Sequence, residues 1–193
     1  MNIGILLYEK VEELDFIGPL EVFLKANSFL NKDLETNRIL RISKDHENVV
    51  CANGTTVKPD YSYDDAPSLD ILVVPGGQGS RKERYNPSTK GFILKSYPRL
   101  KYLLSVCTGS LILAEIDLLN GKKATTHHEA IDLLKQYPEV TVVENVRFTR
   151  DGNIVTSAGI TAGIDASLYL LEQLYPQKGE EISTRVRRRL EYE

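Results

Sequence analysis

The sequence contains no tryptophan, a single methionine and only two cysteines. Two cysteines are too few for a disulfide framework, and such a count is typical of a reducing compartment. No apolar stretch approaches the roughly 20 residues that cross a bilayer. Residues 1–8 lack the basic n-region and the small-residue cleavage site of a signal peptide. We therefore expect a cytoplasmic protein without a membrane partner.

The chain also lacks a strong net charge of either sign: its formal net charge is -3 over 193 residues. No global field therefore draws the chain to nucleic acid. The basic run at residues 185–189 is offset by acidic residues at 180, 181, 191 and 193, which is typical of a solvated helix face. Because no helix-turn-helix pattern accompanies it, we expect no nucleic-acid partner. The length favours one domain over residues 1–193.

Short buried strands alternate with helices along the chain. Apolar runs predict strands at residues 3–8, 38–43, 71–74, 103–106 and 154–156. Helices are expected from Pro19 to before Asn31 and over 89–97, 157–174 and 180–190, with another after the cysteine at 107. The minor elements are a hairpin (49–51 and 55–57), a loop at 61–68, strands at 123–125, 140–143 and 146–149, and a Thr126–Glu129 capping box. The pattern predicts an α/β fold with a mostly parallel sheet between helical layers and ligands at the carboxyl ends of the strands.

Cys107 stands between the strand predicted at 103–106 and the helix predicted after it. An apolar run leads up to it, Thr108-Gly109 follows, and a small-and-aliphatic segment suited to a buried helix comes next. A sharp strand-to-helix turn of this kind is a nucleophile elbow with cysteine in place of serine, and it requires a strained backbone. The helix N-terminus is expected to favour the thiolate. The alternative is that Cys107 is a small buried hydrophobe.

Two other segments follow predicted strands and should share the sheet edge with Cys107. One carries Asp15, which could equally be a surface acid that caps the next helix. The other is Pro75-Gly76-Gly77-Gln78-Gly79, which could be only a tight turn or a phosphate cradle. It lacks the Lys-Ser/Thr ending of a P-loop, so nucleotide binding is not expected.

Five segments together resemble the ThiJ/PfpI superfamily, which is class I glutamine amidotransferase-like. They are LDFIGPLEVF at 14–23, PGG at 75–77, VCTG at 106–109, ATTH at 124–127 and SAGITAGID at 157–165. The pattern is most similar to the isonitrile hydratase branch. The resemblance implies a flavodoxin-like three-layer sandwich, a homodimer and a nucleophile at Cys107. It also implies that Asp15 is the acidic partner of the cysteine and that the N–H groups of Gly77 and Thr108 are oxyanion donors.

Three positions depart from related branches of that superfamily. Peptidase-like members carry histidine where this chain has Thr108, and glyoxalase-like or deglycase-like members usually carry glutamate where it has Asp15. Both activities are therefore less favoured. His128 stands where the hydratase and regulator branch often has tryptophan, so the pocket wall is expected to differ.

His127 lies 20 positions after Cys107, where several members of the superfamily place a histidine near the sulfur. It could instead be a first-turn helix residue that hydrogen-bonds locally. Because His127 and His128 are adjacent, they diverge on a helix and make a poor metal pair. We expect neither a metal nor a cofactor. Asp165 is expected to form a structural salt bridge.

The leading interpretation is a cysteine-dependent hydratase or hydrolase of a small molecule, with hydration of an isonitrile to an N-substituted formamide as the specific hypothesis. The alternatives are a non-enzymatic ligand or oxidation sensor based on Cys107 and a glyoxalase-like or deglycase-like enzyme. In the leading hypothesis Cys107 attacks, Asp15 transfers protons, Gly77 and Thr108 bind the oxyanion, and His127 is a further candidate.

Overall fold

A seven-stranded sheet forms the centre of the protein in a computed structural model, which describes residues 1–30 and 36–192. The strand order is β10 (Phe148–Asp151), β11 (Ile154–Ser157), β7 (Tyr102–Val106), β6 (Ile71–Val74), β1 (Asn2–Leu6), β2 (Arg38–Ser43) and β5 (Tyr61–Ser62). Every pairing in this sheet is parallel except that of β10 with β11. The predicted mostly parallel sheet is confirmed.

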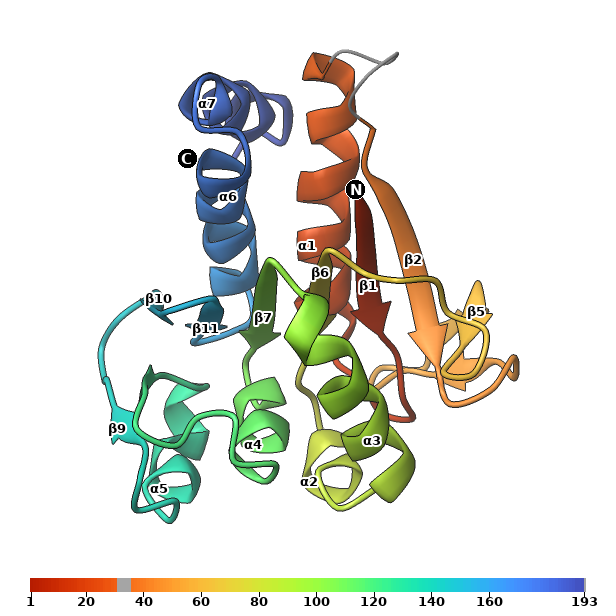
Figure 1. Ribbon diagram of the computed structural model, residues 1–193, viewed down its shortest axis with the longest axis vertical. Coiled ribbons are helices and arrows are strands. Elements are labelled where there is room, and N and C mark those ends of the chain that lie inside the picture. The colour runs from red at the N-terminus through yellow and green to blue at the C-terminus, as the bar shows by residue number, and fades with distance from the viewer. Residues whose placement is uncertain (31–35, 193) are drawn as a thin grey trace.

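Helices lie on both sides of the sheet because its central strands are buried on both faces. β6 and β11 are buried at every position, which requires cover on both faces. One group of helices consists of α1 (Glu13–Ala26), α6 (Ala162–Leu174) and α7 (Gly179–Arg189), which pack on one another. The other group consists of α2 (Ser80–Glu83), α3 (Pro87–Ser96) and α4 (Gly109–Ala114), and Figure 1 shows it apart from the first. The chain therefore folds as a flavodoxin-like three-layer sandwich, as predicted.

Smaller elements complete the fold. β3 (Val49–Val50) and β4 (Thr56–Val57) form the expected antiparallel hairpin, and β8 (Lys123–Ala124) pairs with β9 (Thr141–Val142). α5 (Ile131–Leu134) follows a 3-10 turn at His128–Ala130. Two further 3-10 turns occupy Asn27–Phe29 and Tyr97–Arg99. In residues 1–30 and 36–192, no helix combines the length and the hydrophobicity needed to span a membrane.

The prediction that the first helix begins at Pro19 was wrong, because α1 already begins at Glu13. Acidic side chains in its first turn match the positive end of the helix dipole, and Pro19 removes only one backbone donor from the interior. Asp15 is therefore a helical residue and not a loop residue. The helix ends at Ala26; Asn31, its predicted outer limit, lies outside the described residues.

Three other predicted segments differ in the structure. The last long helix begins at Ala162 and not at Ser157, since the turn before it contains Gly159 with φ 111°. The strand predicted at 146–149 lies at Phe148–Asp151, and the segment predicted as a loop at 61–68 opens with β5.

The Thr126–Glu129 capping box was also a wrong prediction. His127 occupies the cap position, and its Nδ1 accepts a hydrogen bond from the Glu129 N–H at 3.3 Å. The Thr126 hydroxyl instead donates to the carbonyl of Cys107 at 3.0 Å. Thr126 therefore stabilises the cysteine turn.

Gly109, the first residue of α4, lies where the sheet and the helix approach most closely. A Cβ there would stand 2.1 Å from the Val74 carbonyl oxygen, whereas a Cβ at Gly91 in α3 would meet nothing within 4 Å. We expect Gly109→Ala to lower the free energy of unfolding by about 1–3 kcal/mol through overpacking. Gly91→Ala, the matched control, should raise it by about 0.5–1 kcal/mol. Urea unfolding curves test both changes, and equal effects would refute the close-approach argument.

Candidate active site

Cys107 lies on the turn between β7 and α4, and its backbone has φ 55°. A left-handed conformation in a residue other than glycine costs about 1–3 kcal/mol and persists only when neighbouring groups enforce it. The predicted sharp turn with a strained cysteine is present.

Hydrogen bonds from three segments hold this strained residue. The Cys107 N–H donates to the carbonyl of Ser157 at 3.1 Å, at the end of β11. The Cys107 carbonyl accepts from the hydroxyls of Thr126 at 3.0 Å and Ser110 at 3.1 Å. Because both backbone polar groups are engaged, the cysteine backbone has little freedom to relax to an ordinary conformation.

Gly159 brings the turn before α6 directly against the cysteine. A Cβ at Gly159 would lie 2.6 Å from Cβ of Cys107 and 3.1 Å from its Sγ. Any larger side chain would therefore displace the sulfur. The sequence motif at 157–165 contained this glycine, but nothing in the sequence assigned it a contact with Cys107.

Asp15 is fully buried in the first turn of α1, beside the cysteine. Its Oδ2 accepts a hydrogen bond from the Gly76 N–H at 3.0 Å. Burial raises the pKa of the Asp15 carboxyl to about 7, and the charge of Glu12 adds to this effect. The Gly76 N–H and the Cys107 side chain act in the opposite direction but do not offset the burial. Asp15 can therefore hold a proton near neutral pH.

The Cys107 thiol has a raised pKa, contrary to the expectation that the helix would favour a thiolate. Burial and then the charge of Asp15 raise it to about 12. The backbone and hydroxyl of Thr108 lower the pKa by hydrogen bonding, but less strongly. A six-residue helix is too short to outweigh the loss of solvation. Cys107 is accordingly not a thiolate by virtue of its helix.

The two acids therefore act as a coupled pair. The charge of Asp15 raises the pKa of Cys107, and a contact between the two side chains raises the pKa of Cys107 and lowers that of Asp15. That contact lacks the geometry of a regular hydrogen bond, because Oδ1 of Asp15 is buried without a well-formed partner among the described residues. Between about pH 7 and about pH 12 the pair holds one proton, and the two pKa values place it mainly on sulfur. Transfer of that proton from sulfur to the carboxyl group gives a thiolate beside an acid.

The predicted oxyanion donors, Gly77 and Thr108, lie beside the cysteine but are engaged with the protein. The Gly77 N–H donates to Oγ1 of Thr108 at 3.1 Å. The Ser80 hydroxyl lies 2.8 Å from the Gly77 carbonyl and 2.7 Å from the Thr108 hydroxyl. Ser80 is fully buried, and sequence reasoning missed it. The three residues fix the glycine turn to the cysteine turn.

Tyr8 is a second residue that the sequence did not indicate as part of the site. Its buried hydroxyl donates to the carbonyls of Pro75 at 2.6 Å and Gly76 at 3.0 Å. Tyr8 thus positions the peptide whose N–H contacts Asp15. The sequence signal that could have indicated Tyr8 is a tyrosine just after a buried strand.

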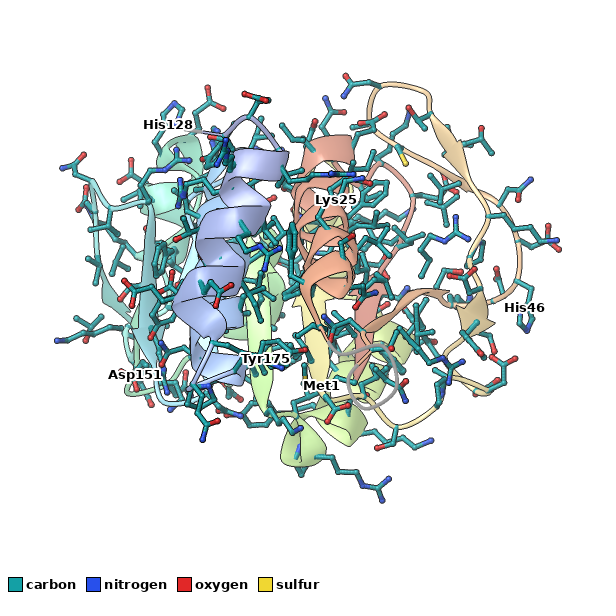
Figure 2. All side chains as sticks on the ribbon, turned by 90° about the horizontal axis from the view of Figure 1, so that it is seen from above. Met1, Lys25, His46, His128, Asp151 and Tyr175 are labelled. Atoms are coloured by element: carbon teal, nitrogen blue, oxygen red, sulfur yellow. The ribbon has the colours of Figure 1, made fainter. Side chains whose placement is uncertain are left out.

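His127 hydrogen-bonds locally, with the Glu129 N–H, which is the alternative given for it above. Burial lowers the pKa of its imidazole, and the groups that act on it by charge are His128, Glu129 and Arg81. His127 contacts the His128 ring, with the centroids 4.3 Å apart. Figure 2 shows His128 at the outer edge of the molecule.

Asp165 is part of an ion pair with Arg147, as expected. Arg147 also donates to the hydroxyls of Thr161 and Tyr192, both at 3.0 Å. The cluster ties the C-terminal region to the turn before α6. Within the described part of the chain, no group of three or more His, Cys, Asp or Glu side chains could hold a metal ion.

Comparison with known proteins gives the family. The model of the DJ-1/PfpI family matches residues 1–173. The chain belongs to the DJ-1/PfpI family. A solved ThiJ/PfpI family protein from Pseudomonas syringae superposes with a TM-score of 0.85 at 29% identity, covering 100% of this chain and 75% of that one.

Two curated relatives point to different activities within the DJ-1/PfpI family. Isonitrile hydratase of Pseudomonas putida is 37% identical over 192 residues, which cover 100% of this chain and 78% of the relative. The HTH-type transcriptional regulator CdhR of Pseudomonas aeruginosa is 34% identical over 172 residues, which cover 88% of this chain but only 50% of the regulator. Enzymes and regulators thus share this fold.

The two cysteines should differ in reactivity. Cys51 is completely buried, and burial followed by the charges of Glu13, Glu9 and Glu12 raises its pKa to about 11. Cys107 keeps 8% of its surface exposed, whereas Cys51 has none, so a reagent can reach only Cys107 in the folded protein. We expect iodoacetamide at pH 7.5 to modify Cys107 in the folded protein and Cys51 only after unfolding. Peptide mass spectrometry measures both rates, and equal rates would exclude a specially activated Cys107.

The Asp15 pKa predicts how stability depends on pH. The folded protein keeps this proton up to about pH 7, whereas an unfolded aspartate loses it near 3.8. The free energy of unfolding should therefore fall by about 4 kcal/mol as the pH rises through that interval. Asp15→Asn should lack this component. Urea unfolding of both proteins from pH 4 to 8 measures the difference; parallel curves would show that the Asp15 pKa is not raised.

Proposed function

We propose that this protein is a cysteine-dependent hydratase of small molecules and that it converts isonitriles to N-substituted formamides. The buried Cys107–Asp15 pair carries this proposal, since one proton shared by a thiol and a carboxyl group can supply both a nucleophile and an acid. The 37% identity to an isonitrile hydratase over the full chain supports the choice of substrate.

In the first step the Cys107 sulfur bonds to the terminal carbon of R–N≡C while Asp15 delivers its proton to the same carbon. The product is a thioimidate, R–N=CH–S–Cys107, beside an Asp15 carboxylate. No net charge is created within the buried pair, because the negative charge passes from sulfur to the carboxylate. The low polarity of the site therefore does not oppose the step.

In the second step Asp15 takes a proton from water as the oxygen bonds to the thioimidate carbon. It passes that proton to the nitrogen. The tetrahedral intermediate then collapses: the C–S bond breaks, the hydroxyl proton goes to Asp15, and R–NH–CHO leaves. Thiolate and acid are restored together, so the site is ready for another turnover.

The oxygen of that intermediate needs hydrogen-bond donors, and we assign the Gly77 N–H as one of them. It is occupied by the Thr108 hydroxyl. We assign Thr108 the role of a movable partner, which rotates to release Gly77 and whose own N–H stays with the sulfur. His127 has no assigned role in this sequence of steps.

Exposed apolar side chains adjoin the site residues along the chain. Leu14 and Ile17 flank Asp15 in the first turns of α1, and Ile160 follows Gly159; each is 37% exposed. An apolar substituent R would bind against them. The same surface suits a two-fold contact with another copy of the chain, so we also propose a homodimer.

We further propose that the protein is located in the reducing cytoplasm, where both free cysteines persist.

Turnover by the purified protein tests the function directly. An aliphatic and an aromatic isocyanide should each yield the formamide, Cys107→Ala should yield none, and methylglyoxal should be left unchanged. Turnover of methylglyoxal instead would indicate a glyoxalase-like enzyme. No turnover of either substrate, combined with selective peroxide oxidation of Cys107, would support a sensor, which is the alternative that the regulator relatives favour.

Asp15→Asn gives the sharpest test of the proton transfers. The amide keeps the shape of the side chain and can still contact Gly76, but it has no transferable proton. Turnover should fall by roughly 10²–10⁴-fold while Cys107 can still be alkylated. The matched control, Asp64→Asn, changes an exposed aspartate and should leave turnover unaltered. Near-normal turnover of Asp15→Asn would assign the proton transfer to another group.

Sedimentation tests the proposed dimer. One chain has a mass of 21.7 kDa, and we expect a species of about twice this mass at micromolar concentration. Ile17→Lys, which places a charge in the proposed contact, should release monomers, and Leu94→Lys on α3 is the control. If the wild-type protein sediments as a monomer, the proposed dimer is wrong.

A further inference from the structure

We propose that a cavity at the carboxyl ends of β1, β2 and β5 binds a small zwitterion with an apolar body, of the size of an aromatic amino acid or a dipeptide. The cavity has a volume of about 630 Å³, within the range of small-molecule sites. Neither Cys107 nor Asp15 lines it. The cavity adjoins the proposed hydratase site through Tyr8, whose hydroxyl holds the Gly76 peptide, but the proposed ligand site does not depend on the hydratase function.

Two fixed tyrosines give the cavity a rigid, partly apolar wall. Tyr63 stacks on Phe92 with the ring centroids 4.6 Å apart, and its hydroxyl lies 2.9 Å from that of Thr89. Tyr8 is held by its hydrogen bond to the Pro75 carbonyl. Because both rings are already positioned, a ligand that packs on them loses little free energy to ordering of the protein.

Glu83 supplies an unused carboxylate oxygen to the same cavity. Its Oε1 accepts hydrogen bonds from Asn86 at 3.0 Å and from the Thr89 hydroxyl. Its Oε2 has neither a hydrogen bond nor an ion pair with any residue that the structure describes. The carboxylate is thus held at one oxygen and open at the other, which suits an ammonium group.

Lysines complete the charge pattern. Lys10, Lys44 and Lys82 line the cavity, and none of them forms an ion pair within the described part of the chain. A ligand carboxylate would form an ion pair with one of these lysines. A phosphorylated ligand is disfavoured because four acidic side chains, Glu9, Asp45, Glu47 and Glu83, line the same space. Charges of both signs favour a ligand that carries both.

Isothermal titration calorimetry at pH 7.5 tests the site with L-phenylalanine and L-alanyl-L-phenylalanine. 2-Phenylethylamine and 3-phenylpropionate are the matched analogues with a single charge. A zwitterion should bind saturably and at least about tenfold more tightly than either analogue. Glu83→Gln, which keeps the oxygen that Thr89 and Asn86 contact, should weaken binding by about tenfold. At least one of Lys10→Met, Lys44→Met and Lys82→Met should weaken it by a similar factor.

Glu139→Gln and Lys58→Met are the controls, because both residues are exposed and lie outside the cavity. Cys107→Ser should bind like the wild type, whether or not the protein hydrates isonitriles. The proposal is overturned if neither zwitterion binds, if a single-charge analogue binds equally well, if Glu83→Gln leaves the affinity unchanged, or if none of the three lysine variants weakens binding. Loss of binding in Cys107→Ser would also overturn it, since the ligand would then occupy the catalytic site.

Discussion

Two acidic groups, the thiol of Cys107 and the carboxyl of Asp15, are buried against each other, and the rest of the site depends on this contact. No cation contributes to the pKa of either group among the described residues, so the pair tolerates one negative charge and keeps one proton near neutral pH. The six-residue helix α4 does not offset the burial, so Cys107 is not a permanent thiolate. The pair keeps one proton, and the proposed hydration uses its transfer between sulfur and oxygen.

The fold brings these groups together at the edge where the carboxyl ends of β1, β6 and β7 meet. Asp15 follows β1, the Gly76 N–H that binds it follows β6, and Cys107 follows β7. A fourth strand, β11, contributes the Ser157 carbonyl that holds the cysteine backbone. The strain at Cys107 is sustained because hydrogen bonds from separate segments fix both of its backbone polar groups.

The sheet and the position of Cys107 could be predicted because they depend on local patterns, namely apolar runs and a cysteine followed by Thr-Gly. The start of α1 could not, because Pro19 is a strong start signal and the tertiary contacts of the preceding turn outweighed it. Nor could the sequence give the pKa of Cys107, which depends on burial by segments distant in the chain. Ser80 and Thr126 were missed for the same reason: a hydroxyl becomes part of a site only through the partner it contacts in space.

The shared proton can be observed directly by NMR of protein labelled with ¹³C at the cysteine Cβ. As the pH is varied from 5 to 10, the Cys107 signal should show an inflection near pH 7, where Asp15 titrates, and Asp15→Asn should abolish this inflection. Cys51, which interacts with other carboxylates, provides the internal reference within the same spectrum. An identical Cys107 titration in the wild type and in Asp15→Asn would show that the two groups do not share a proton and would contradict the account.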